Sequence, residues 1–249
     1  MKTITWSPSE FELEMNTVWS FPKRGDWATH DATYRGNWSP YLPRNILLRY
    51  STEGDLVLDQ FIGGGTTLVE AKLLNRNCIG IDVNPYALQR CKEKCDFIGN
   101  NYGKVEIRKG DARDLYFIET ESIDLICTHP PYANIIKYSN YIEDDISRLS
   151  VKDFLEQIKI VANECYRVLK NTKFCAILMG DMRKEGHVVP LGFEVMKLFV
   201  NAGFKTKEII IKEQHNCKTT GYWKATSIKH NFLLLAHEYL FIFRKIGTH

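Results

Sequence analysis

Three short apolar runs in the first half of the chain each end in an aspartate, at Asp59, Asp82 and Asp111. A carboxylate at such a position can accept a hydrogen bond from an ammonium group, both hydrogen bonds of a ribose diol, or one from an exocyclic amine. Three consecutive glycines lie in the turn 60–67, and their missing Cβ atoms let the backbone approach a ligand closely. Taken singly, such a turn is typical of a tight loop and such an aspartate of a helix N-cap. Together and in this order they predict a site for a nucleoside-containing cofactor.

The details of the turn favour S-adenosylmethionine over a nicotinamide cofactor. The nicotinamide fingerprint G-x-G-x-x-G needs a third glycine where this chain has Leu68, and Asp59 would face a pyrophosphate unfavourably. S-adenosylmethionine instead carries an amino-acid end, a ribose and an adenine, which match the acids and the glycines. The cofactor-binding residues that we expect are Asp59, Phe61, Gly63, Gly64, Gly65, Thr66, Thr67, Asp82, Asn84, Asp111 and Ala112.

A fourth apolar run ends in the motif Thr-His-Pro-Pro-Tyr at 128–132. Two prolines cannot donate backbone hydrogen bonds, so they stop a strand, fix an extended backbone and leave carbonyl groups pointing outward beside an aromatic ring. An exocyclic amine needs acceptors for its hydrogens and a ring that stacks on its base. An isolated Pro-Pro-Tyr would favour a simple turn with a packing tyrosine, but here the motif follows a cofactor-type turn. The catalytic residues that we expect are His129, Pro130, Pro131 and Tyr132, with no metal ion.

Alternating strands and helices must position these residues. We expect strands at 55–59, 78–82, 105–111, 123–128, 174–179, 207–211 and 238–244, and helices at 66–76, 85–99, 151–170 and 190–203. This alternation predicts an α/β fold with a doubly wound, mostly parallel, seven-stranded sheet. No helix is expected between the last two strands, which favours an antiparallel C-terminal edge. Ligands of such sheets bind at the carboxyl ends of the strands, where the strand order reverses.

Composition is that of a folded, reduced protein. The 249 residues are 44% hydrophobic and 25% charged, which predicts a single domain over 1–249 rather than a disordered chain. The N-terminus has no apolar segment typical of a signal peptide, and no apolar stretch is long enough to span a bilayer. Seven cysteines without a C-x-x-C pair indicate free thiols and a cytoplasmic location.

Basic residues interleaved with aromatic side chains indicate a nucleic-acid partner. The net charge is only +3, but lysines gather between 205 and 230, and a second basic cluster lies at 23–49 beside Trp27, Tyr34 and Trp38. A solvated charged surface is the simpler alternative. We expect a contacting loop at 212–230, with a surface loop whose tryptophan packs on the sheet as the alternative, and a loop at 133–150 that closes over a base. The candidate nucleic-acid-binding residues are Lys137, Tyr138, Arg183, Lys218, Tyr222, Trp223 and Lys224.

The two motifs resemble those of the amino-methyltransferases of DNA, which make N4-methylcytosine or N6-methyladenine. The sequence DQFIGGGTT at 59–67 is similar to the cofactor motif DPFxGSGTT of that family, and THPPY is similar to its catalytic motif, D/N/S-P-P-Y/F/W. The likeness covers roughly 34–245 and implies a class I methyltransferase fold. It also implies that the N-terminal segment 1–50 packs on the cofactor site and that double-stranded DNA is the partner, with the target base flipped out.

Three residues depart from the family pattern. Gln60 replaces the usual proline and Gly64 the usual serine, whereas His129 replaces Asp, Asn or Ser and offers one acceptor nitrogen. Thr128 before the motif is closer to the T-S-P-P-Y form of N4-cytosine enzymes, so N4 of cytosine is favoured over N6 of adenine. The alternatives are a tRNA guanine-N2 methyltransferase, which usually carries an extra N-terminal domain, and an inactive nucleic-acid-binding module. The sequence shows no large insertion that could serve as a separate target-recognition domain. Recognition of a short site, a homodimer or a partner subunit would each compensate for this.

Overall fold

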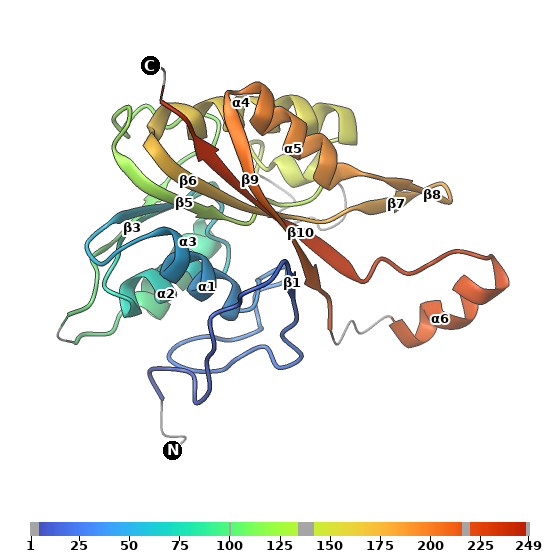
Figure 1. The fold of residues 1–249 in the computed structure, drawn as a ribbon, viewed down its shortest axis with the longest axis horizontal. Helices are drawn as coiled ribbons and strands as arrows, with labels where there is room; N and C mark the ends of the chain where they lie inside the picture. The colour runs from blue at the N-terminus through green and yellow to red at the C-terminus, as the bar shows by residue number, and fades with distance from the viewer. Residues whose placement is uncertain (1–4, 100, 134–141, 216–219, 248–249) are drawn as a thin grey trace.

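A mixed β-sheet between two layers of helices forms the core of the protein (Figure 1). The computed structural model describes residues 5–99, 101–133, 142–215 and 220–247. Within these ranges the strands are β1 (Val18–Trp19), β2 (Leu56–Asp59), β3 (Asn77–Asp82), β4 (Val105–Lys109), β5 (Ile123–Thr128), β6 (Leu169–Met179), β7 (Met182–Lys184), β8 (His187–Val189), β9 (Phe204–Glu213) and β10 (His237–Lys245). The helices are α1 (Tyr41–Tyr50), α2 (Thr66–Leu73), α3 (Pro85–Cys95), the 3-10 turn η1 (Ile146–Arg148), α4 (Val151–Val168), α5 (Leu191–Asn201) and α6 (Thr220–Lys229).

The strand order confirms the predicted α/β fold. Neighbouring strands of the main sheet follow the order β1-β9-β10-β6-β5-β2-β3-β4. Strands β6, β5, β2, β3 and β4 are mutually parallel, whereas β10 is antiparallel to both β6 and β9. The chain moves outward from β2 through β3 to β4 and then returns to place β5 on the other side of β2. The strand order therefore reverses between β2 and β5.

Two apolar clusters fill the space between the sheet and its helices. One joins the inner sides of α4 and α5 to one face of the sheet, and the other joins α1, α2 and α3 to the opposite face. The helix starts follow local chemistry, since the Asn84 side chain accepts the Tyr86 backbone N–H ahead of α3, and Ser150 accepts that of Asp153 in α4. Pro85 begins α3, as the sequence predicts.

The structure corrects several details of the predicted elements, and it adds α1, β7 and β8 to them. An eighth strand, β1, pairs in parallel with β9 at the sheet edge, and its two residues are too few to show a periodic pattern. The segment 212–230, expected as a loop, begins inside β9 and contains helix α6. Residues 216–219, including Lys218, lie outside the described residues. Helix α6 escaped prediction because its apolar residues do not gather on one face, and both Tyr222 and Ile228 are exposed.

In the ranges that the structure describes, none of the helices has an apolar stretch long enough to cross a membrane.

Candidate active site

The two sequence motifs meet where the strand order reverses. Asp59 ends β2 and Thr128 ends the adjacent parallel strand β5. The Thr128 hydroxyl donates a hydrogen bond of 2.7 Å to Oδ1 of Asp59, and the Phe61 backbone N–H donates one of 3.1 Å to the same atom. The glycine-rich turn and the His-Pro-Pro-Tyr motif are therefore joined at one point of the carboxyl edge of the sheet.

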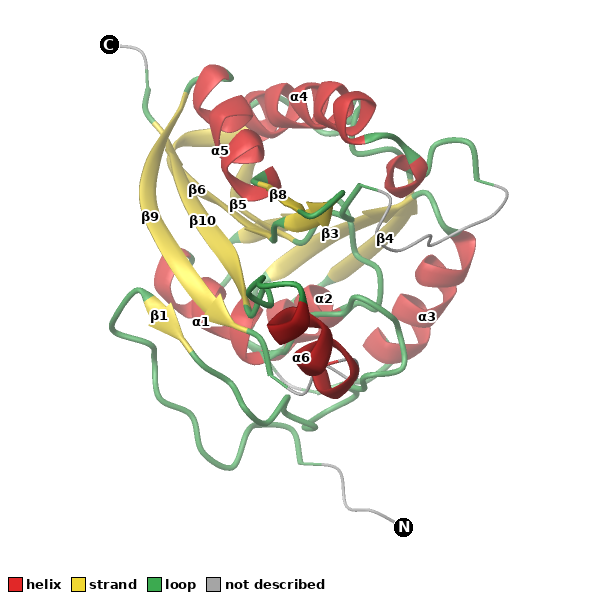
Figure 2. Ribbon diagram, turned by 90° about the vertical axis from the view of Figure 1, so that its right-hand side faces the viewer, coloured by secondary structure: helices red, strands yellow, loops and turns green. Residues whose placement is uncertain are grey.

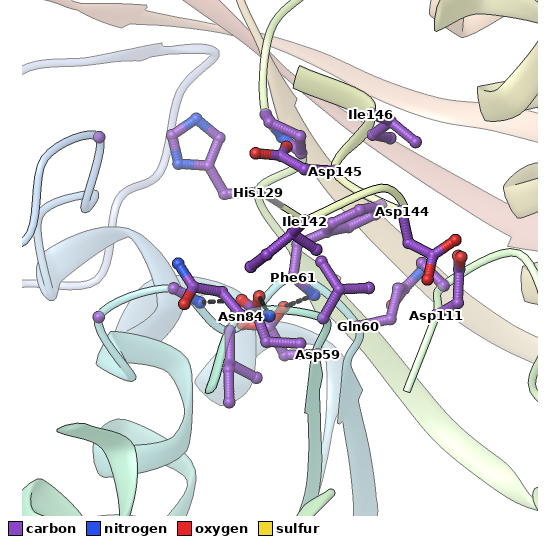
Figure 3. A pocket seen from close by; sticks show the side chains of 18 of the residues that line it. Asp59, Gln60, Phe61, Asn84, Asp111, His129, Ile142, Asp144, Asp145 and Ile146 are labelled. Carbon is purple, nitrogen blue, oxygen red and sulfur yellow. Dashed lines mark hydrogen bonds between the residues drawn. The ribbon is translucent and has the colours of Figure 1, made fainter. Parts of the chain in front are cut away.

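A cleft opens at this point, lined by side chains from the ends of β2, β3 and β5 (Figure 3). Concave sites with a few convergent polar groups are where ligands typically bind. Of the predicted site residues, those in its lining are Asp59, Phe61, Gly63, Gly64, Asp82, Asn84, Asp111, Ala112, His129 and Pro131. Pro130 is buried and Tyr132 half-buried outside the lining, and Gly65, Thr66 and Thr67 lie behind it at the start of α2.

Asp82 is fixed by the turn on one side and by the start of α3 on the other. Its Oδ2 accepts the backbone N–H of Gly63 at 3.0 Å, and its Oδ1 accepts that of Asn84 at 2.9 Å. Burial raises the pKa of Asp82 to about 6, and the nearby carboxylates Asp59 and Asp145 add to this rise against the two backbone hydrogen bonds. At neutral pH the group is a carboxylate with lone pairs left for a ligand.

The N-terminal segment forms the opposite wall of the turn. A Cβ atom on Gly64 would lie 2.7 Å from the side-chain nitrogen of Asn37, and one on Gly63, at φ +45°, would lie 3.1 Å from the ring of Tyr34. The Asn37 side chain also accepts a 2.6 Å hydrogen bond from the Thr66 hydroxyl. These glycines therefore leave room for the segment 34–38 as well as for a ligand, which accounts for glycine at 64, where the family pattern has serine.

Several residues of the cleft were not among the predicted site residues. Tyr34, Asn37 and Trp38 enter from the N-terminal segment. Asp144 and Asp145 enter from the segment before η1 (Figure 3). The sequence indicated them only through the ranges 1–50 and 133–150, both expected beside the site, and through the aromatic residues of the first basic cluster. Residues 134–141 lie outside the described residues, and so do the candidates Lys137 and Tyr138.

Asp111 lies in the cleft with its carboxylate already engaged. The guanidinium and backbone N–H of Arg113 both donate to it, and the Nε of Arg113 lies 2.9 Å from each Asp111 oxygen. Arg113 also bonds to Asp144 at 3.1 Å and to Gln157 at 2.7 Å. Asp111 can therefore offer a ligand only the lone pairs that Arg113 leaves.

The His-Pro-Pro-Tyr motif continues into a chain of hydrogen bonds that reaches β9 and β10. His129 Nε2 lies 3.2 Å from the Tyr132 hydroxyl, which donates a 2.7 Å hydrogen bond to Oε1 of Glu238. Lys212 donates to Oε2 of Glu238 at 2.8 Å. Burial lowers the pKa of His129 to about 4, so the imidazole is neutral at physiological pH. Its ring stacks on Trp38, with ring centroids 5.6 Å apart.

The candidate nucleic-acid-binding residues that fall within the described ranges lie outside the cleft. Tyr222 and Trp223 are 75% and 43% exposed on α6, and Lys224 is exposed beside them. Arg183 on β7 donates to the carbonyl oxygen of Leu233 at 2.9 Å, and its guanidinium lies over the ring of Phe232. Arg183 therefore ties the β7–β8 hairpin to the segment after α6.

The residues of the cleft fit S-adenosylmethionine. The acids Asp59 and Asp82 line a single cavity, which suits a cationic ligand that also carries a diol. Burial raises the pKa of Asp59, while hydrogen bonds from Thr67, Thr128 and Phe61 oppose the rise. The side-chain oxygen of Gln60 is buried without a hydrogen-bond partner in the described chain, so the cavity holds a polar acceptor that a ligand amine can satisfy.

Comparisons with known proteins identify two overlapping family patterns. A family described as "DNA methylase" matches residues 3–93 and 123–249, which is most of the chain. A second, described as "Methyltransferase domain", matches residues 58–131, from β2 to the catalytic motif.

Curated relatives are similar over shorter stretches. Type II methyltransferase M.HpaI of Haemophilus parainfluenzae is 40% identical over 67 residues, which cover 27% of this chain and 21% of that protein. The tRNA (guanine(10)-N2)-dimethyltransferase of Methanothermobacter thermautotrophicus is 35% identical over 101 residues, or 40% of this chain and 29% of that protein. The matched stretches thus span less than a third of either relative.

Solved structures support the fold. A SAM-dependent methyltransferase from Methanosarcina mazei superposes with a TM-score of 0.58 at 16% identity, covering 82% of this chain and 98% of that one. TrmN from Thermus thermophilus gives a TM-score of 0.57 at 19% identity, covering 85% of this chain and 50% of that one. The chain has the Rossmann-like fold of S-adenosylmethionine-dependent methyltransferases.

Proposed function

The chain belongs to the DNA methylase family, and from this premise we propose that it methylates double-stranded DNA at an exocyclic amino group of a flipped base. The methyl donor is S-adenosylmethionine, and N4 of cytosine is favoured over N6 of adenine. One observation carries the proposal. The glycine-rich turn after β2 and the residues His129 and Pro131 after β5 line the same cleft, joined by the bond between Thr128 and Asp59.

In this proposal the side chains and carbonyl groups of the cleft bind and orient the methyl donor and the target amine. Asp59 and Gln60 offer acceptors for the amino-acid end of the donor, Asp82 for its ribose and Asp111 for its adenine. When bound, S-adenosylmethionine supplies an electrophilic methyl group on a sulfonium. His129 and the carbonyl oxygen of Pro130 accept the hydrogens of the target amine, which draws its nitrogen toward a tetrahedral, more nucleophilic form. Positioning of the two reactants then provides most of the acceleration.

A base must leave the duplex to reach this cleft, at a cost of a few kcal/mol. Tyr132 follows the lining residue Pro131 and is itself half-buried outside the lining. Its ring is the one that we propose for stacking, and Glu238 holds its hydroxyl. Stacking of a base on an aromatic ring is worth about 1–3 kcal/mol. The segment 142–146 adds an apolar side chain, Ile142, and two acids to the rim of the cleft.

Contacts to the duplex are assigned to the carboxyl edge of the sheet. The β7–β8 hairpin follows β6 and helix α6 follows β9, and both strands end at the same edge as β5. Figure 2, which views the molecule from the right of Figure 1, shows α6 in front of the remaining fold. Tyr222 and Trp223 supply exposed rings there, and Lys224 a cation for phosphate.

A tRNA guanine-N2 methyltransferase is the second candidate, favoured by the similarity to the archaeal dimethyltransferase. Incubation of the protein with labelled S-adenosylmethionine and either duplex DNA or tRNA, followed by mass analysis of the released nucleosides, separates the two. We expect N4-methylcytosine from DNA, with N6-methyladenine as the other DNA product. N2-methylguanosine from tRNA would replace the proposal with the second candidate, and the absence of transfer to either would indicate an inactive module.

A further inference from the structure

An ion pair between the buried Glu238 and the half-buried Lys212 adjoins the His-Pro-Pro-Tyr motif through Tyr132, and neither residue is among the predicted site residues. Glu238 on β10 and Lys212 on β9 are opposite each other in the strand register. Glu238 is 7% exposed, and the Lys212 ammonium lies 2.8 Å from its Oε2. Although burial opposes ionisation, Lys212, His129 and the Tyr132 hydroxyl hold the pKa of Glu238 below its usual value. The group is therefore a fixed carboxylate.

This carboxylate determines the direction of the hydrogen bonds that lead to the cleft. A carboxylate only accepts, so the single hydroxyl hydrogen of Tyr132 points to Oε1 of Glu238, 2.7 Å away. The Tyr132 oxygen then accepts from the other side, where His129 Nε2 lies at 3.2 Å. The hydrogen of the neutral imidazole must consequently reside on Nε2.

The second ring nitrogen of His129 is left as an acceptor. One face of the imidazole stacks on Trp38, and the edge that carries Nε2 is taken by Tyr132. The half-buried ring lines the cleft, and none of the described residues bonds to its Nδ1. A bare nitrogen is thus the polar atom that the imidazole offers to a ligand.

We propose that Glu238 and Lys212 are positioning residues that act through Tyr132 to fix the tautomer of His129, so that its Nδ1 accepts a hydrogen of the target amino group. The inference rests on the proposed methyl transfer and names the acceptor that replaces the Asp, Asn or Ser oxygen of the family pattern. The opposite tautomer would point an N–H donor at the amine hydrogens and repel them. Together with the Pro130 carbonyl oxygen, Nδ1 would hold the amine hydrogens and leave the nitrogen lone pair directed toward the donor methyl.

The tautomer is measurable without substrate or cofactor. Long-range ¹H–¹⁵N correlation spectra of histidine-labelled protein distinguish a protonated from a bare ring nitrogen, and the His129 signals are those missing from the His129→Asn spectrum. In the wild-type protein at pH 7 we expect hydrogen on Nε2 and a bare Nδ1. A signal pattern with hydrogen on Nδ1 would overturn the inference and leave the proposed methyl transfer untouched.

Glu238→Gln tests the role of the carboxylate. The amide can donate to Tyr132, which frees the hydroxyl hydrogen to turn toward His129 Nε2, so we expect the His129 hydrogen to shift toward Nδ1. Transfer should then show kcat lowered by about tenfold, the equivalent of one hydrogen bond, with the Kd for S-adenosylmethionine unchanged. Glu208→Gln, the same charge change at a half-buried site of β9 where the partner is Lys207, should alter neither the spectrum nor kcat.

Circular dichroism of each variant checks that it is folded. If Glu238→Gln does not fold, Lys212→Met replaces it, because loss of the ion pair is expected to act in the same direction. A changed tautomer with unchanged kcat in an active enzyme would contradict the assignment of Nδ1 as the acceptor. A lowered kcat with an unchanged tautomer would contradict the route through His129. Both changes together support the inference, whichever amine proves to be the substrate.

Discussion

Asp82 illustrates how a single residue is prepared for its ligand by its surroundings. One backbone N–H on each carboxylate oxygen holds the side chain across the gap between the glycine-rich turn and α3. Burial raises its pKa to about 6, well above the usual range of an aspartate. The carboxylate therefore loses its charge within an experimentally accessible range of pH.

Binding of S-adenosylmethionine is expected to weaken as the pH falls through 6. In the proposed binding mode the ribose hydroxyls use both oxygens of Asp82 as acceptors, and protonation converts one of these oxygens into a donor. Because the raised pKa makes the proton compete with the ligand, Kd measured by calorimetry should rise by up to about tenfold per pH unit between pH 6 and pH 5. Above pH 7 it should be constant.

Asp82→Asn provides the matched variant for this pH dependence. It should bind the cofactor more weakly at every pH and lose the dependence near pH 6, whereas Glu93→Gln on the exposed side of α3 should behave as wild type. If the dependence persisted in Asp82→Asn, a different carboxylate, with Asp59 the nearest candidate, would be responsible.

For single residues, the sequence predicted the motif residues of the cleft but not the residues that form hydrogen bonds with them. Asp59, Asp82 and His129 stand beside recognisable turns, so their role in the cleft could be anticipated from local pattern. Glu238 is 106 positions away from Tyr132, its hydrogen-bond partner, and lies within an ordinary apolar strand. Such a contact is created by the antiparallel insertion of β10 beside β6, which residue spacing does not encode.

At the scale of elements, one buried glutamate fastens the N-terminal segment to α2. Glu70 is fully buried and accepts hydrogen bonds from Trp27 and His30 at 2.7 Å and from Arg44 at 2.9 Å. The segment between Trp27 and Arg44 contains Tyr34, Asn37 and Trp38, the N-terminal wall of the cleft. Glu70 therefore couples the stability of the segment to the shape of the cofactor site.

Glu70→Ala should lower the free energy of unfolding by about 3–5 kcal/mol, because it leaves the Arg44 guanidinium without its buried partner. The loosened wall should also raise the Kd for S-adenosylmethionine. Urea denaturation and calorimetry measure the two effects. Glu93→Ala, an exposed glutamate on α3, should stay within about 0.5 kcal/mol of wild type. Loss of stability without loss of affinity would show that the segment does not shape the site.

The elements that periodicity predicted are those that pack against the sheet. Helix α4 carries an apolar stripe from Phe154 to Val168 and could be recognised from it, as could the alternation of β2 to β6 with helices. Among the elements that escaped prediction, β1, α6 and the β7–β8 hairpin project from or border the core, so no periodic burial marks their sequence. Helix α1 escaped prediction too, although its Leu42, Ile46 and Leu47 are buried in the core. The expected closing strands were correct, but the helix between them was not foreseen.

For the molecule as a whole, parallel strand direction gathers its chemistry at one edge. The cleft is lined by residues that follow β2 and β5. The hairpin β7–β8 follows β6, and α6 follows β9 (Figure 1). Arg183 connects the hairpin to the segment after α6 through Leu233 and Phe232. The two projections are therefore linked to each other at the carboxyl edge of the sheet, the edge to which the proposed function assigns the duplex.

Removing the cations of α6 should weaken DNA binding in a salt-dependent manner. Lys224 and Lys229 are exposed on α6, and neither forms a salt bridge to a residue that the structure describes. Each lysine that neutralises a phosphate contributes about 0.9 to the slope of log K against log salt. The double variant Lys224→Gln, Lys229→Gln should therefore reduce that slope by about 1.8 if both lysines contact phosphate. Fluorescence anisotropy measures the slope, and the affinity for the cofactor should be unchanged.

Lys104→Gln is the control, because Lys104 is an exposed lysine before β4 at the opposite edge of the sheet. It should leave the slope as in wild type. An equal loss in this control would assign the effect to net charge rather than to α6.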